Sequence, residues 1–199
     1  MAGFLRDVVS HADGRRPGAL ALALALALGL AACAANTPPR ASPRGVARAL
    51  VDGRAIVVEY GRPWRRDRTI FGELVPYGRV WRTGADEATV LQTDLPLRFE
   101  DHLLEPGRYT LWTVPGRQRW TIILNAQTGQ WGTDYHAAHD LFRMEVPVRR
   151  TRRMIDQFTI RVRVRRARGT LTLLWERTRV TVPFGVVRPA AAHAGRNLR

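Results

Sequence analysis

Three charged residues close together, Arg82, Asp86 and Glu87, are the strongest candidates for chemistry in this sequence. A guanidinium can hold a carboxylate through two parallel hydrogen bonds, and a carboxylate in a cleft can serve as a general base. The three side chains could therefore form a ligand clamp or an acid–base pair. They could also form an ion-pair network that only fixes their loop against a sheet, and we favour this structural role because such networks are common.

Six tryptophans are many for a chain of 199 residues. Three of them lie within apolar runs typical of strands and are predicted to be core residues: Trp112, Trp120 and Trp175. The others, Trp64, Trp81 and Trp131, lie in expected loops or at strand ends. Near arginine, such indoles could stack on a sugar or another planar ligand, or they could plug the open ends of the fold. We take Trp81 and Trp131 as candidate ligand-binding residues beside the charged cluster.

One segment resembles a metal site. Two histidines three residues apart, His136 and His139, are flanked by Asp134 and Asp140, and histidines at this spacing can share one face of a helical turn. The spacing is loose and matches no established zinc pattern, so we expect solvated loop histidines rather than metal ligands. No cofactor is predicted.

The residue types that are missing narrow the possible chemistry. The chain has no lysine, its only cysteine is Cys33, and its two serines, Ser10 and Ser42, fall in a predicted leader and a predicted tether. Nucleophilic catalysis by serine, cysteine or lysine and Walker-type phosphate binding are therefore excluded from the predicted domain. Carboxylates, histidine, threonine and tyrosine remain.

The beginning of the chain resembles a bacterial lipoprotein signal. Arg15 and Arg16 precede an apolar run that is too short to span about 30 Å of hydrocarbon, and the run ends in Leu-Ala-Ala-Cys33. The resemblance implies a signal peptide over residues 1–32, cleavage before Cys33 and lipid on that cysteine. Residues 33–45, which include three prolines, are expected to form a flexible tether.

The resemblance to lipoproteins also predicts where the protein lies. Ala34 stands where inner-membrane lipoproteins carry aspartate, so we expect a cell-envelope protein that is anchored through Cys33 in the outer membrane and faces the periplasm. Loss of residues 1–32 lowers the formal charge only from +15 to +14. An exported protein rarely meets nucleic acid, so none is predicted as a partner. The basic surface would instead face anionic lipid or solvent.

Short runs of alternating apolar and polar residues fill the chain from about Val46 onward and indicate an all-β fold. The expected strands are 54–60, 89–93, 95–100, 108–114, 120–125, 141–148, 157–165, 170–175 and 178–184. Their spacing predicts an antiparallel β-sandwich of eight to ten short strands over residues 46–184. Short helical turns are expected near Ile70–Val75 and His136–Leu141, and a disordered tail over 185–199.

Arginine is concentrated near the end of the predicted domain. Residues 149–179 contain eleven arginines, whereas Asp156 and Glu176 are the acidic residues there. In the segment Phe158–Arg165 arginines and a threonine alternate with apolar residues, so we expect one face of this strand in the core and the other exposed to solvent. The solvent-exposed face could bind an anion. Arginine on an exposed strand also prevents aggregation through strand edges, and we favour this second role.

Two long ordered strings resemble a known family. They are Tyr60–Pro63 continued by Arg68–Thr89, and Leu104–Gly116 followed by Trp120 and Gln130-Trp131-Gly132. Together they are similar to the bacterial domain of unknown function 2911 family over roughly residues 41–184. The resemblance implies a compact β-rich envelope domain, in a family whose members are typically exported and often lipidated. It implies no activity.

These observations predict an envelope lipoprotein whose sandwich binds a small molecule, glycan or partner protein without catalysis. Arg82, Asp86 and Glu87, with Trp81 and Trp131, would line the site. The alternative is a hydrolase or isomerase in which Asp86 or Glu87 acts as base and Arg82 holds an anion. A third possibility is a purely structural scaffold.

Overall fold

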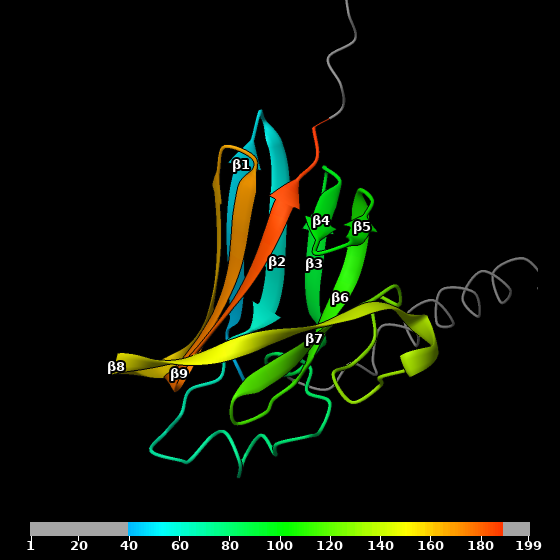
Figure 1. The fold of residues 1–199 in the computed structure, drawn as a ribbon. Helices are drawn as coiled ribbons and strands as arrows, with labels where there is room; N and C mark the ends of the chain where they lie inside the picture. The colour runs from blue at the N-terminus through cyan, green and yellow to red at the C-terminus, as the bar shows by residue number, and fades with distance from the viewer. Residues whose placement is uncertain (1–39, 189–199) are drawn as a thin grey trace, which may run out of the picture. The chain divides into compact units, whose positions relative to one another are not determined.

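A computed structural model describes residues 40–188, which form an all-β domain (Figure 1). Its strands are β1 (Arg44–Val51), β2 (Arg54–Gly61), β3 (Thr89–Thr93), β4 (Leu97–Phe99), β5 (His102–Leu104), β6 (Gly107–Val114), β7 (Arg119–Asn125), β8 (Asp140–Arg165) and β9 (Arg168–Val186). One 3-10 turn, η1 (Ala137–His139), precedes β8 and lies within the predicted helical segment 136–141. Over this part of the chain no helix is long and apolar enough to span a bilayer. The predicted signal peptide, Cys33 and residues 189–199 of the predicted tail lie outside the described residues.

The strands form one open antiparallel sheet in the order β1-β2-β3-β6-β7-β8-β9-β4-β5. The two halves of the sheet face each other across a common core, so the predicted antiparallel all-β class is confirmed. The Tyr60 hydroxyl on β2 joins the halves: it donates to the Ile160 carbonyl of β8 at 3.3 Å and accepts from the Ile160 N–H at 2.9 Å. The Tyr60 ring also meets Phe158 edge-on at 5.7 Å.

Two strands are much longer than expected. The predicted strands 141–148 and 157–165 are parts of β8, and 170–175 and 178–184 are parts of β9. The β8–β9 pairing shifts register between Arg150 and Ile155 and again before Thr159. These irregularities bend β8, which pairs with β7 through its first part and with β9 through most of its remaining length. The irregular part of β8, between Arg150 and Thr159, therefore bends the strand where the sequence predicts a loop between two separate strands.

The folded domain begins earlier than the predicted boundary at residue 46. β1 starts at Arg44 and pairs with β2 along its whole length, so residues 40–45 are part of the domain and not of a tether. The sequence hides β1 because its inward side chains include only small apolar residues such as Ala47, while Val46 and Leu50 face outward. At the other end, β9 continues to Val186 and extends the domain beyond residue 184.

The segment Ile70–Val75 is a hydrogen-bonded turn and not the expected helical one. The Val75 N–H donates to the Ile70 carbonyl at 2.8 Å, and Gly72 has a left-handed φ of 102°, which interrupts helical geometry. The Glu176 carboxylate on β9 accepts from the backbone N–H groups of Ile70 at 2.9 Å and Phe71 at 3.3 Å. Two acceptor oxygens thus fix the turn to the sheet.

Candidate functional site

A rigid loop, residues 81–89, positions the candidate charged residues between β2 and β3. The Thr89 hydroxyl donates to the Thr83 carbonyl at 2.8 Å, and the Trp81 indole N–H donates to the Gly84 carbonyl at 3.1 Å. Thr83 and Asp86 both adopt left-handed φ values, 55° and 64°, which non-glycine residues rarely accept. The surrounding hydrogen bonds hold this conformation, and strain of this kind is concentrated at functional sites.

Two glycines allow neighbouring backbone to approach this loop closely. A Cβ at Gly132 would overlap the Arg82 side chain and the Asp86 carbonyl, and a Cβ at Gly61 would overlap the Ala85 carbonyl. The Gly132 N–H donates to the Asp86 carbonyl at 3.0 Å. Glycine at these positions is therefore a packing requirement of the loop.

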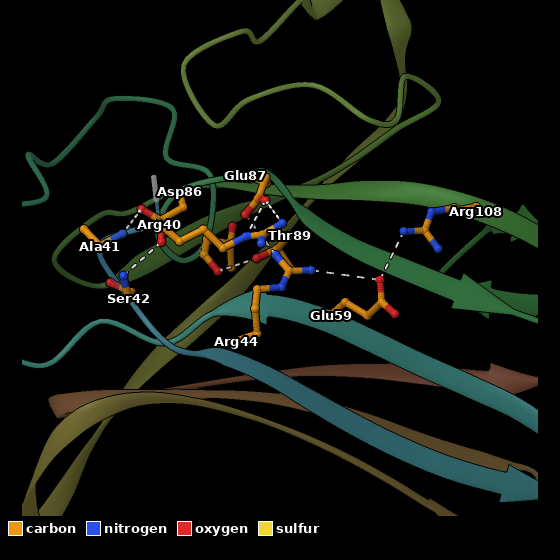
Figure 2. Close-up of polar contacts among 10 residues, drawn as sticks. Arg40, Ala41, Ser42, Arg44, Glu59, Asp86, Glu87, Thr89 and Arg108 are labelled. Carbon is orange, nitrogen blue, oxygen red and sulfur yellow. Dashed lines mark hydrogen bonds and ion pairs between the residues drawn. The ribbon is translucent and has the colours of Figure 1, made fainter. Parts of the chain in front are cut away.

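The two acidic residues are held by the N-terminal strap, which we define as residues 40–44 (Figure 2). The Asp86 carboxylate accepts from the backbone N–H groups of Ala41 at 3.2 Å and Ser42 at 3.0 Å. The Glu87 carboxylate accepts from Arg40 Nε at 2.6 Å and from Arg44 Nη1 at 3.2 Å. Both carboxylates thus bind the segment that was predicted to be a tether.

The expected clamp between Arg82 and the acidic pair does not form. Among residues 40–188 Arg82 has no ion-pair partner, and Arg40 and Arg44 take the place predicted for it at Glu87. Burial of Glu87 by itself raises the pKa of its carboxyl, but hydrogen bonds from Arg40 and the backbone, with the charges of Arg44 and Arg40, outweigh burial and hold that pKa below its usual range. Glu87 is therefore an ionised structural anchor and a poor general base.

The Arg82 guanidinium lies apart from this network and is half-buried. Its Nε is inaccessible to solvent and has no hydrogen-bond partner within the described part of the chain. Burial lowers the pKa of the Arg82 guanidinium, and the charge of Asp86 partly opposes that effect. Because arginine stays protonated in proteins, the Arg82 guanidinium is a partly desolvated cation whose Nε–H makes no hydrogen bond within residues 40–188.

Arg82 forms part of the wall of a cavity of about 440 Å³. The lining combines the strap, the loop 81–89, the loop after β2 and one residue of β9: Ala41, Ser42, Pro43, Pro63, Trp64, Arg66, Arg68, Leu74, Val75, Trp81, Arg82, Gly84, Ala85, Asp86 and Trp175. The lining contains three arginines and one carboxylate, and that carboxylate already binds the strap. The cavity lining is therefore basic overall and also includes apolar side chains.

The tryptophans divide differently from the sequence expectation. Trp81 is only 9% exposed and stacks on Trp175, with ring centroids 6.0 Å apart and planes at 17°, so it is a core residue that also lines the cavity. Trp131 is half-buried and pairs through its backbone with Glu87, and it is not among the residues that line the cavity. Trp64, 48% exposed, lines the cavity instead.

The histidine segment has a different organisation from a metal site. The His136 and His139 rings lie 6.4 Å apart and at right angles. The Asp140 carboxylate accepts from the Tyr135 hydroxyl at 2.6 Å and from Arg143 at 2.7 Å, so it is used within the protein. From residue 40 to residue 188, no three histidine, cysteine or acidic side chains are placed to hold a metal ion.

Comparison with known families agrees with this all-β domain. The family model described as "protein of unknown function (DUF2911)" matches residues 42–184, which include every strand from β1 to β8 and most of β9. The chain belongs to the DUF2911 family. No curated protein and no solved structure matches it significantly.

In this DUF2911 domain the sequence located the loop but not its partners. Arg40 and Arg44 lie more than 40 positions before Glu87, and no local pattern links them to it. Ser42 was excluded from the domain, yet its N–H binds Asp86 and the residue lines the cavity. The geometry offers a cavity lined by three arginines and several apolar side chains, and both carboxylates are already bound to the strap.

Proposed function

We propose that this chain is an envelope lipoprotein whose DUF2911 domain binds a ligand non-catalytically in the Arg82 cavity. The ligand carries an anionic group for Arg82 and the neighbouring arginines, and a planar or apolar part for Trp64 and Leu74. Phosphorylated or acidic sugars and lipid headgroups have this chemistry. The lipobox-like sequence at Cys33 supports anchoring in the outer membrane with the domain in the periplasm.

The group of three arginines in the cavity lining, Arg66, Arg68 and the half-buried Arg82, is the observation that carries this proposal. A bound anion accepts charge-assisted hydrogen bonds from guanidinium groups at the cavity surface, and these are stronger than hydrogen bonds between neutral groups. The volume of the cavity, about 440 Å³, suits a small metabolite. A purely structural arginine would be expected to have its donor satisfied by a protein oxygen.

The carboxylates favour binding over the alternative hydrolase or isomerase. Asp86 and Glu87 would have to release the strap before either could accept a proton from a substrate. In addition, the lowered pKa of Glu87 makes it a weak base at neutral pH. These contacts support a module that holds its ligand and does not transform it.

The test is ligand-dependent stability of residues 34–199, which lack the predicted lipidated cysteine and retain the complete core. A panel of inorganic phosphate, sugar phosphates, uronic acids and neutral sugars is screened by thermal unfolding. A true ligand at about one hundred times its Kd adds about 2.7 kcal/mol, which corresponds to roughly 5–10 °C for a domain of this size. The shift should disappear in Arg82→Gln and persist in Arg161→Gln, an exposed arginine on β8.

Loss of the shift counts only where the variant is folded, so its near-ultraviolet circular dichroism must match that of the unmodified domain. A shift that Arg82→Gln leaves unchanged would place the ligand elsewhere. A flat response to every anion in the panel would contradict the proposal.

A further inference from the structure

One end of the domain combines exposed apolar side chains with unpaired arginines. We call it the basic end: it comprises the loop 62–80 and the irregular part of β8, residues 150–156, with the adjacent Arg177 of β9. Trp64, Leu74 and Met154 are there, and they are 48%, 46% and 40% exposed. Nine arginines accompany them: Arg62, Arg65, Arg66, Arg68, Arg79, Arg150, Arg152, Arg153 and Arg177.

Direct contacts bring these two segments together. The Arg65 N–H donates to the Asp156 carbonyl at 2.6 Å, and Trp64 pairs with Gln157 through an isolated antiparallel bridge. Further along the loop, Tyr77 shares a cavity of about 270 Å³ with Met154 and Arg177. The basic end is therefore one continuous surface and not two separate patches.

The positive charge of this end is not neutralised by the protein itself. Its ion pairs join Arg65 to Asp67 at 2.7 Å and to Asp156 at 3.2 Å. Across the described residues, the other eight arginines of the basic end lie in no ion pair. Glu73 is the remaining exposed acid, since Glu176 binds the turn at residues 70–71. A strongly positive field therefore remains.

The described chain also begins at this end. Ala41 and Ser42 of the strap line the same cavity as Trp64 and Leu74. Arg40 lies only seven positions after Cys33, and a chain of that length spans at most about 25 Å. A lipid on Cys33 would thus keep the basic end within reach of the bilayer.

We propose that the basic end docks on an anionic bilayer surface. The arginines bind lipid phosphates, and Trp64, Leu74 and Met154 enter the interfacial layer, where indole and flexible apolar side chains are favoured. The docking rests on charge and exposed apolar area and does not require the ligand proposed for the Arg82 cavity.

The test is partition of residues 34–199, without lipid, onto vesicles in a flotation assay. Vesicles of phosphatidylcholine are compared with vesicles of equal parts phosphatidylcholine and phosphatidylglycerol, at low and high salt. We expect binding only to the anionic vesicles, with loss at high salt because the phosphate contacts are screened. Quenching of tryptophan fluorescence by a brominated lipid should fall in Trp64→Phe.

A matched pair of charge variants locates the docking surface. Replacement of Arg150, Arg152 and Arg153 by glutamine should weaken partition roughly 100-fold, since each arginine near an anionic surface contributes a factor of about five. The same replacement at Arg161, Arg163 and Arg165, exposed on the straight part of β8, removes equal charge and should leave most of the binding.

Equal losses in the two triple variants would show that net charge alone causes binding and would overturn the proposal. Absence of binding to anionic vesicles would also overturn it and would leave this end to a protein partner. Arg82→Gln distinguishes bilayer docking from ligand binding in the Arg82 cavity. This substitution should abolish the ligand-dependent stability and leave partition onto vesicles intact.

Discussion

Replacement of Glu87 by glutamine should release the N-terminal strap while the shape of the side chain is kept. Glu87 accepts from Arg40 and Arg44 and is 21% exposed, so its ion pairs are partly screened by solvent. We expect the free energy of unfolding to fall by about 1 kcal/mol, which lowers the thermal midpoint by roughly 2–4 °C. Glu145→Gln, a control at a more exposed pair with Arg119, should change it less.

The stabilisation of the folded domain by Glu87 should depend on pH. The pKa of Glu87 is lower in the folded protein than its usual value of 4.5. The stabilisation by Glu87 is therefore complete above that usual value and is lost as the pH falls through the lower folded pKa. The unmodified domain and Glu87→Gln should differ most near neutral pH and converge in acid.

Two measurements test this reasoning together. Chemical denaturation at several pH values gives the difference in unfolding free energy, and amide hydrogen exchange reports on the N–H groups of Ala41 and Ser42. Exchange there should become faster in Glu87→Gln, because the strap opens locally more often. Unchanged exchange together with an unchanged midpoint would refute the assignment of Glu87 as the anchor of the strap.

Three further substitutions test the architecture of the site. Gly132→Ala should lower the free energy of unfolding by about 1–3 kcal/mol, because its Cβ would overlap the Arg82 side chain and the Asp86 carbonyl. Gly185→Ala should be nearly neutral, because a Cβ there makes only ordinary contacts. Denaturant unfolding measures both changes. Trp81→Ala should cost about 3–5 kcal/mol by the same measurement, and Trp64→Ala at most about 1 kcal/mol, because one indole is core and the other is half exposed. Tyr60→Phe leaves a buried backbone N–H without its acceptor and should cost about 1–3 kcal/mol, with a matching loss of exchange protection on β8.

Local alternation was sufficient to predict most of the strands in the first half of the domain, although not β1 or β5. The runs that became β2, β3, β6 and β7 carry clear period-two patterns and turn residues at their ends. The same signal failed at β1, where small inward residues and apolar outward ones remove the contrast. It also divided β8 and β9, because a bulge rich in arginine has the composition of a loop.

The site was predictable only in part, because its contacts join residues distant in sequence. The sequence draws attention to the loop that carries Arg82 and Asp86, but the partner of the acidic pair is the strap, and Trp81 is part of the core. Neither fact follows from spacing along the chain. The unsatisfied Arg82 donor is likewise a property of the packed structure.

The most direct test of the proposed function is calorimetric titration of residues 34–199 with the best anion from the stability screen. The unmodified domain should bind it with one site, and Arg82→Gln should lose at least ten-fold in affinity while Arg161→Gln does not. This difference corresponds to about 1.4 kcal/mol, the lower end of a charge-assisted hydrogen bond. Equal affinity for the ligand in all three proteins would contradict binding at Arg82.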